Sequence, residues 1–177
     1  WKLIRRKISP FFTSGKLKAA YYLIEEKGSK FSKFIEQKLD VHNRVELELK
    51  KVTDLYSMDV IGSIAFGIDS HSLEGVFGEF QEAVHSLFNY TPRRAIELSA
   101  SFLLPSLTKL FNLKFFGEIY SKFILKFVPD VIEAREKSEA RRNDLIDMLI
   151  ELKNEGEFTP NELISQAAVF LSGGIQT

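Results

Sequence analysis

The sequence predicts an all-α fold, and three observations support this prediction. Apolar residues recur at steps of three and four along most of the chain, which is the spacing of one helix face. No run of alternating polar and apolar residues with β-branched enrichment is long enough to predict a strand. The composition, 177 residues of which 45% are hydrophobic and 27% charged, is that of an ordinary folded domain and excludes disordered, collagen-like and low-complexity classes.

The first half of the chain is expected to form long amphipathic helices. An apolar stripe runs from Lys16 to Lys38, with Gly28-Ser29 as a weak point. A second stripe, of period near 3.6, begins at Val45 and is expected to end at Gly67. The segment from Asp69 to Gly78 is then expected to be a loop.

Shorter elements are expected in the middle of the chain. Apolar spacing predicts a short helix over 80–88, which Tyr90-Thr91-Pro92 interrupts. The stretch over 93–113 is apolar but contains Pro105, so short helices and turns are expected there.

Three further helices are predicted in the last third of the chain. The first covers 116–134 and continues into a charged run over 135–139, which is expected to be a solvated face. The second covers 144–153 and is closed by Gly156. Thr159-Pro160-Asn161-Glu162 has the pattern of a capping box with Pro at the first helical position, so a third helix is expected to start there.

The two ends of the sequence suggest a fragment of a longer protein. The chain begins with Trp1 rather than Met and lacks a leader with the pattern of a signal peptide. The run from Leu163 to Thr177 is uncharged and contains no stop signal at its end. No window reaches the roughly 18 consecutive apolar residues of a membrane span, and an anchor upstream of Trp1 stays compatible with the sequence.

Charge is distributed unevenly although its sum is zero. Residues 1–51 carry 13 Lys and Arg against 6 Asp and Glu, whereas residues 52–177 carry 11 against 18. A basic N-terminal face suits a partner with negative charge, and solvated Lys-rich helix faces are the alternative.

The residue types limit the chemistry that the chain can perform by itself. Zero Cys excludes disulfides, thiolate metal sites and Cys nucleophiles within these residues. His42, His71 and His85 lie in different segments without a second ligand three or four residues away, so no metal site is predicted.

One candidate site lies at the start of the chain. Trp1 and Arg5 are four residues apart, so on a helix they share a face and present one indole N–H and one guanidinium group. Together these donors can hold an anionic oxygen group such as a carboxylate. A packing or cation–π pair is the alternative.

A second candidate site lies in Gly173-Gly174-Ile175-Gln176-Thr177. Two adjacent glycines inside a helix cost about 1 kcal/mol each relative to Ala, so a compensating role is expected for the missing side chains. A small ligand or a flat cofactor lying against the helix would use the room, and Thr177 Oγ1 can bond the carbonyl of Gly173. The alternative is a helix that ends at Gly173 with a left-handed cap.

Taken in order, these pieces resemble a stretch of a microsomal cytochrome P-450, the haem-thiolate monooxygenase family, and most of all its insect detoxification branch. Residues 1–5 resemble the WxxxR of that family's helix C, residues 59–69 its helix E and residues 142–150 its helix H. Residues 158–177 resemble the entry and middle of helix I. The resemblance covers essentially the whole chain and implies that residues 1–177 are an internal fragment of one catalytic domain, from helix C to helix I.

The resemblance also implies roles for the candidate site residues. Trp1 and Arg5 would hydrogen-bond a haem propionate, and Gly173 and Gly174 would border the oxygen pocket. Thr177 would be the oxygen-side threonine that steadies bound dioxygen and the water that protonates it.

The sequence departs from the family pattern at the residue before this threonine. Gln176 stands where the family usually has Asp or Glu. Glutamine can hydrogen-bond but cannot deliver a proton by titrating, so either water reaches Thr177 by another route or turnover is altered.

The implied function is insertion of one oxygen atom from O2 into a lipophilic small molecule, with haem as cofactor and NADPH electrons supplied by a reductase. Lys2, Arg6 and Lys7 would belong to the cationic surface that receives the acidic reductase, with solvated side chains as the alternative. Residues 80–127 would span the region that roofs the substrate channel, and the seven Phe over 88–127 suit an apolar substrate and a membrane contact; packing in the core is the alternative for most of them. The parent protein would lie on the cytosolic face of the endoplasmic reticulum membrane. The Cys that holds the family's iron is absent from this sequence, so the fragment alone is expected to be inactive.

One function of a different class is weighed against the monooxygenase. A helical scaffold or adaptor would use the basic N-terminal face to bind an acidic partner without haem. Such a chain is expected to fold cooperatively by itself, whereas a fragment of a larger enzyme is expected to expose part of its core.

Overall fold

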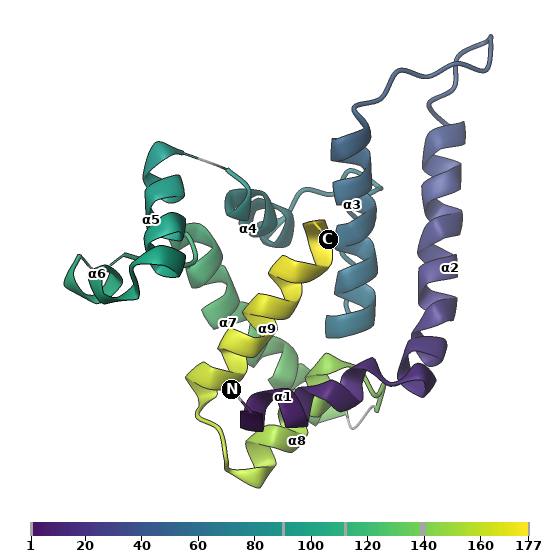
Figure 1. The fold of residues 1–177 in the computed structure, drawn as a ribbon. Helices are drawn as coiled ribbons and strands as arrows, with labels where there is room; N and C mark the ends of the chain where they lie inside the picture. Colours follow the sequence, from purple (N-terminus) through teal and green to yellow (C-terminus); the bar gives the residue numbers. More distant parts are fainter. Residues whose placement is uncertain (1, 90, 112, 139–140, 177) are drawn as a thin grey trace. The chain divides into compact units, whose positions relative to one another are not determined.

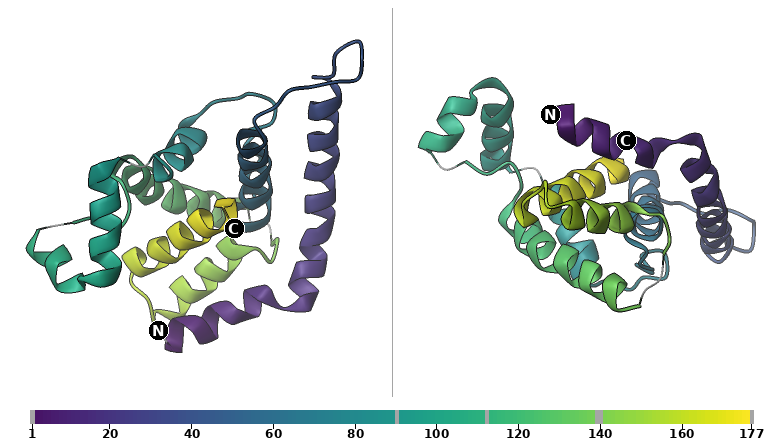
Figure 2. Two further views of the ribbon diagram at one scale, coloured as in Figure 1. Left: turned by 45° about the horizontal axis from the view of Figure 1, so that its top comes forward. Right: turned by 90° about the horizontal axis from the view of Figure 1, so that it is seen from below.

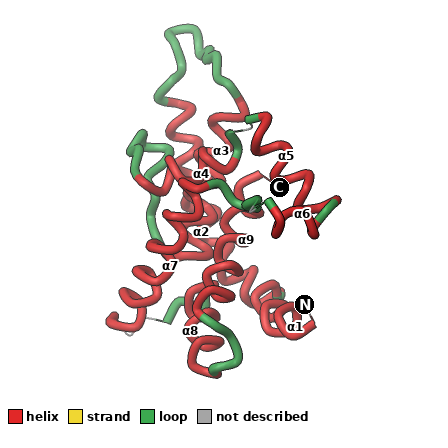
Figure 3. Tube along the Cα trace, turned by 90° about the vertical axis from the view of Figure 1, so that its left-hand side faces the viewer, coloured by secondary structure: helices red, strands yellow, loops and turns green. Residues whose placement is uncertain are grey.

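A computed structural model describes residues 2–89, 91–111, 113–138 and 141–176 (Figure 1). These residues form helices and connecting loops, with no strand in the described ranges, so the predicted all-α class is confirmed (Figure 3). The chain divides into two compact units, Trp1–Val76 with Val128–Thr177, and Phe77–Phe127. None of the helices within the described ranges has the length and apolar character needed to cross a membrane.

The larger unit begins with α1 (Lys2–Ile8), the 3₁₀ turn η1 (Ser9–Phe12) and the long helix α2 (Ser14–Glu36). Helix α2 confirms the predicted stripe but runs through Gly28 without a break, so the expected weak point is wrong. A Cβ at Gly28 would meet only the hydroxyl of Tyr56, at 3.9 Å, and the ring of Tyr56 packs on Phe31 with centroids 5.2 Å apart. The neighbouring helix therefore supports α2 at this position.

Helix α3 (Leu49–Ile61) lies beside α2 and continues into a π-helical turn, η2 (Gly62–Phe66) (Figure 1). Gly67 ends the element with φ of 68°, as the sequence predicted. The helix starts at Leu49 rather than at Val45, and the π turn was not predicted. Phe66 is fully buried, so the wider turn still places its apolar side chain in the core.

The loop expected over 69–78 is present, and a buried carboxylate holds it against α3. Asp59 accepts hydrogen bonds from the backbone N–H groups of Ser72, at 2.7 Å, and Leu73, at 3.2 Å. The hydroxyl of Ser70 also donates to Asp59. The carboxylate is thus compensated for its burial by three donors.

The first part of α7 (Glu118–Ser138) belongs to the smaller unit and the rest to the larger one. Helix α7 confirms the helix predicted over 116–134. It contains Pro129, and the predicted helix likewise continues through this residue. Helix α8 (Leu145–Glu155) starts at its N-cap Asp144, which accepts from the N–H of Asp147, and ends at Gly156 with φ of 71°.

The charged run over 135–139 is not a uniformly solvated face, which corrects the sequence prediction. Arg135 is only 9% exposed. Its guanidinium binds Asp144 through two hydrogen bonds, of 2.7 and 3.0 Å, and Asp147 through one of 2.8 Å. The partners lie 9 and 12 residues away, beyond the three- or four-residue spacing at which side chains of one helix meet.

Helix α9 (Pro160–Gln176) crosses α3 and lies beside α8 (Figure 2). The predicted capping box is confirmed: Thr159 Oγ1 accepts from the N–H of Glu162 at 3.3 Å, and the Glu162 carboxylate accepts from the N–H of Thr159 at 2.8 Å. Ala167, Leu171 and Ile175 recur at four-residue steps and are buried, so this face of α9 supplies part of the core.

The smaller unit contains α4 (Glu79–Leu87), α5 (Pro92–Leu103) and α6 (Pro105–Leu110). Helices α5 and α6 begin at Pro92 and Pro105, so a helix boundary lies at each proline where the sequence predicted an interruption. Phe80 packs on Phe123 and Phe127 at centroid distances of 6.0 and 5.9 Å, which joins α4 to the start of α7.

Candidate functional site

Helix α9 passes through both glycines of the candidate site without a break. It extends to Gln176, and neither Gly173 nor Gly174 has a positive φ. The alternative of a left-handed cap at Gly173 is therefore wrong. The helix keeps two positions without side chains in its last turns, despite the intrinsic cost of glycine there.

The two glycines have different surroundings. A Cβ built on Gly173 meets no heavy atom within 4 Å. A Cβ built on Gly174 would lie 2.7 Å from Cγ1 of Ile61, with Cδ1 closer still. Only Gly173 therefore leaves space at the surface of α9, while the missing side chain of Gly174 is required by the approach of α3.

The face of α9 that carries Gly173 is exposed within the described chain. Val169, one helical turn before Gly173, is an apolar residue and is 54% exposed. The opposite face carries the buried Leu171 and Ile175. We name Val169 and Gly173 together the open face of α9; at Gly173 a ligand can approach the backbone closely.

Arg5 lies in α1, on an exposed part of the helix. Among the described residues, no carboxylate lies within ion-pairing distance of its guanidinium. Its neighbour Lys7 is different, because its ammonium binds Glu155 and lies 3.5 Å from Glu157. The hydrogen bond to Glu155 raises the pKa of Lys7 above its usual value.

This pairing changes one expectation about the cationic surface. Lys7 was predicted to face an acidic partner together with Lys2 and Arg6. In the structure its charge is met by Glu155 at the end of α8, so Lys7 acts as a link between α1 and α8. Lys2 and Arg6 are exposed.

An aromatic cluster connects the segment after α1 to α9. Phe11 and Phe12 both pack on Phe170, with ring centroids 5.4 and 5.5 Å apart, and they contact each other at 5.3 Å. Arg5 therefore belongs to a segment that is fixed to the same helix as Gly173, within one compact unit.

Three of the sequence-predicted site residues are not tested by this geometry. Trp1 and Thr177 lie outside the described residues. Gln176 is the last residue of α9, and its side chain is not among those described. The roles given to these residues stay predictions.

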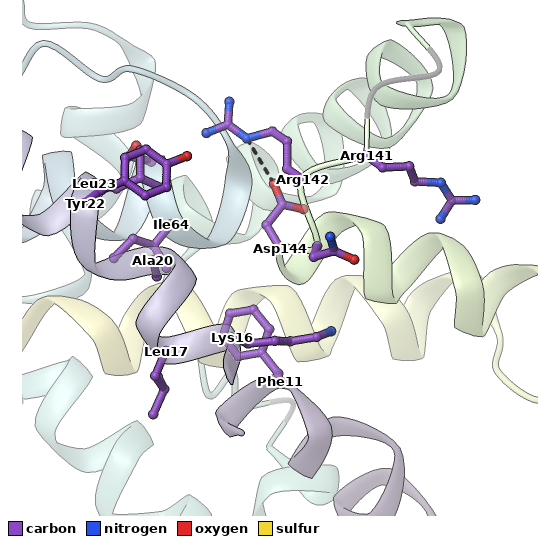
Figure 4. Close-up of a pocket in the computed structure, with 12 residues that line it drawn as sticks. Phe11, Lys16, Leu17, Ala20, Tyr22, Leu23, Ile64, Arg141, Arg142 and Asp144 are labelled. Carbon is purple, nitrogen blue, oxygen red and sulfur yellow. Dashed lines mark ion pairs between the residues drawn. The ribbon is translucent and has the colours of Figure 1, made fainter. Parts of the chain in front are cut away.

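A separate hollow of about 450 Å³ opens in the larger unit, between α2 and the segment before α8 (Figure 4). Leu17, Ala20 and Ile64 form its apolar side, and Arg142 points to Asp144 above them, with the two side chains 3.6 Å apart. None of its lining residues was predicted as a site residue. Leu17 and Ala20 belong to the apolar stripe over 16–38, which predicts a helix and carries no signal for a hollow.

No group of His, Cys, Asp and Glu among the described residues is arranged to hold a metal ion. The cluster of Arg135 with Asp144 and Asp147 is a salt-bridge network between helices. Burial alone would raise the pKa of Asp147, but the N–H groups of Arg142 and Asn143 and the guanidinium of Arg135 outweigh it and lower that pKa. This carboxylate is therefore held ionised for a structural purpose.

The comparisons with known proteins now identify the class of protein. The family model described as Cytochrome P450 matches residues 1–177, and the chain belongs to this family.

Its similarity to particular members is moderate and extends over the whole chain. The chain is 34% identical over 200 residues to Cytochrome P450 6k1 of Blattella germanica, covering 100% of this chain and 38% of that protein. It is 31% identical over 184 residues to Cytochrome P450 6A1 of Musca domestica, covering 100% of this chain and 36% of that protein. Both relatives are insect proteins, which confirms the branch expected from the sequence. The chain spans little more than a third of the length of these relatives.

Proposed function

We propose that this chain is the part of a haem-dependent monooxygenase that runs from helix C to helix I of the catalytic domain. The observation that carries the proposal is the family match over all 177 residues. Its share of 38% of the length of one relative supports an internal portion of a longer enzyme. The sequence contains no Cys, so the thiolate ligand of the iron would come from elsewhere in the parent protein.

The described residues fit a haem group. A porphyrin needs close approach to backbone, which Gly173 permits because no side chain projects there, and the exposed Val169 one turn earlier offers an apolar contact. Arg5 carries a guanidinium without a carboxylate partner in the described chain, and a haem propionate would supply one. Trp1, four residues before Arg5 in the sequence, would add an indole N–H donor.

When bound, haem supplies the oxygen-activating chemistry that inserts one oxygen atom from O2 into a lipophilic substrate with NADPH electrons delivered by a reductase. The chain's own residues orient and protect this chemistry. Arg5 and Trp1 would hold the propionates, and Gly173 would keep the space beside α9 free of side chains. The hydroxyl group of Thr177 would steady the protonating water, whereas Gln176 can hydrogen-bond but cannot deliver a proton by titrating.

The same proposal assigns partners to two exposed surfaces. Lys2 and Arg6 in α1 form a basic surface that an acidic reductase would contact. In the smaller unit, α5 and α6 expose large apolar side chains, such as Phe102 at 74% and Leu103 at 76%. Such exposure supports contact with a membrane, and we place the parent protein on the cytosolic face of the endoplasmic reticulum membrane.

Nothing in the structure or the comparisons favours the alternative of a haem-free adaptor. Its basic N-terminal face is partly neutralised within the chain, because Lys7 binds Glu155. An adaptor also gives no reason for a helical glycine with open space beside it, such as Gly173 in α9.

The test is haem retention by the full-length enzyme. Wild-type enzyme is expected to show the absorbance band of a thiolate-ligated haem when reduced under carbon monoxide. Arg5→Ala is expected to lose haem on gel filtration, while the neighbouring control Arg6→Ala, which points about 100° away on the same helix, retains it. Equal retention in both variants, or no haem in the wild type, contradicts the proposal.

The role of Thr177 has its own measurement. Replacing Thr177 by Ala in the full-length enzyme is expected to raise the amount of peroxide released per NADPH consumed, because the hydroxyl that holds the water is lost. Unchanged coupling would remove Thr177 from the site.

A further inference from the structure

Gly174 contacts α3 rather than the open face of α9. A Cβ at this position would lie 2.7 Å from Cγ1 and 3.4 Å from Cβ of Ile61. Carbon atoms pack at about 3.5–4.0 Å, so a methyl group here requires a displacement of about 1 Å. The contact includes the stem of the Ile61 side chain, and a β-branched side chain in a helix has one strongly preferred χ1, so rotation of its tip does not remove the overlap.

Ile61 stands at the point where α3 changes its winding. It is the last residue of the α-helical part, and the π turn begins at Gly62. The carbonyl of Gly62 accepts from the N–H of Gly67 and from the N–H of Ile68, the latter at 3.0 Å. Isolated π turns in helices occur often at functional sites. The irregular end of α3 therefore meets α9 where α9 lacks a side chain.

A displacement at Gly174 is transmitted to Gly173. The two residues are adjacent in a continuous helix, with Cα atoms 3.8 Å apart across any trans peptide, so they move together. Leu171 and Ile175, on the buried side of the same turns, are 0% and 3% exposed and hold α9 against the core. The distance between α9 and α3 thus decides where the open face lies.

We propose that Ile61 is a positioning residue for the cofactor side of α9: its contact with Gly174 sets the depth at which α9 packs on α3 and so fixes Gly173 beside the haem. This inference rests on the haem-binding function proposed above. It assigns different tasks to the two glycines, because Gly173 makes room for the cofactor and Gly174 makes room for Ile61.

A size exchange in the full-length holoenzyme tests the proposal. Gly174→Ala is expected to shift the haem absorption maximum and to lower turnover by roughly tenfold to a hundredfold, the range associated with a displacement of about 1 Å. The double variant I61A/G174A removes both Cγ1 and Cδ1 of Ile61, which overlap the new methyl group, and is expected to restore the wild-type spectrum and most of the turnover, although the side chain at position 61 then contributes less to the core. The double variant I61V/G174A removes only Cδ1 and keeps Cγ1 at 2.7 Å, so it is expected to restore them only in part.

Gly28→Ala is the matched control. Gly28 also lies inside a long helix, but a Cβ there meets only the hydroxyl of Tyr56 at 3.9 Å. This variant is expected to keep the spectrum and the turnover, which excludes a general effect of replacing a helical glycine.

The outcomes separate the two proposals. A wild-type enzyme without haem refutes the proposed function. A normal spectrum in Gly174→Ala, or a perturbed spectrum that neither double variant restores, refutes the positioning role alone. If Gly174→Ala does not accumulate as holoenzyme, recovery of holoenzyme in either double variant supports the contact, and failure of both overturns it.

Discussion

Replacing Arg135 by Met is expected to be among the most destabilising substitutions in this chain. The guanidinium makes three hydrogen bonds, of 2.7 to 3.0 Å, to Asp144 and Asp147, whose side chains are each 5% exposed. Removing it leaves two carboxylates buried without their cation, for which losses of about 3–5 kcal/mol are typical. For a chain of this size that loss corresponds to roughly 6–20 °C in Tm.

Urea and thermal unfolding followed by circular dichroism measure this effect. The control is Arg141→Met, because Arg141 is 66% exposed in its side chain and lies 3.6 Å from a single carboxylate, that of Glu151. The control is expected to lose less than about 1 kcal/mol. If both variants lose the same amount, or if Arg135→Met loses under about 1 kcal/mol, the cluster does not hold α7 to α8.

Other predictions concern stability at single positions. Gly67→Ala is expected to lower the free energy of unfolding in urea by about 3 kcal/mol or more, because φ is 68° and the new Cβ would overlap the guanidinium of Arg135. Gly156→Ala is the control: φ is 71° but the surrounding space is open, so the expected loss is only about 1 kcal/mol. The pKa of Asp147 is lower in the folded chain than in the unfolded chain, so its ionised form stabilises the fold, and this stabilisation is lost as the pH falls below about 4. Asp147→Asn is therefore expected to have a lower free energy of unfolding near neutral pH and to lose less of it on acidification. Urea unfolding across this pH range measures both effects. Thr159→Ala removes one half of the capping box and is expected to lower the free energy of unfolding by about 1 kcal/mol, and an unchanged midpoint in urea would show that the cap does not contribute.

Local signals predicted most of the helices. The capping box at Thr159, the end of α8 at Gly156 and the end of η2 at Gly67 depend on a few adjacent residues, and each was found where the sequence placed it. The interruptions predicted at Pro92 and Pro105 also depend on local signals, and in the structure a helix begins at each of these prolines. These features are set by backbone chemistry within one turn, which a sequence shows directly.

Features that depend on distant residues were not predicted. The burial of Arg135 requires the carboxylates of Asp144 and Asp147 at the start of α8, and the charge pattern of α7 does not predict them. Helix α2 continues through Gly28 because α3 supports it, and η2 widens where its residues pack into the core. Tertiary packing overrides local propensity in each case.

The candidate site shows the same division. A Cβ at Gly173 would meet no heavy atom within 4 Å, and the role of Gly173 beside a cofactor stays a prediction. Arg5 was predicted as a donor, and the described chain supplies no competing carboxylate. Ile61 was not predicted as a site residue, because nothing in its own helix shows which residue of α9 it meets.

The two glycines show why a motif alone does not assign roles. The sequence predicts one role for both glycines, as two missing side chains that make room for one cofactor. The contacts divide them, because a methyl group at Gly173 would enter open space and one at Gly174 would enter Ile61. Successive residues of a helix point about 100° apart, so one glycine can face a ligand while the next faces another helix. In the haem-binding function proposed above, such a helix would need both an open face and a contact behind it that holds this face in place, and Gly173 and Gly174 would supply the two.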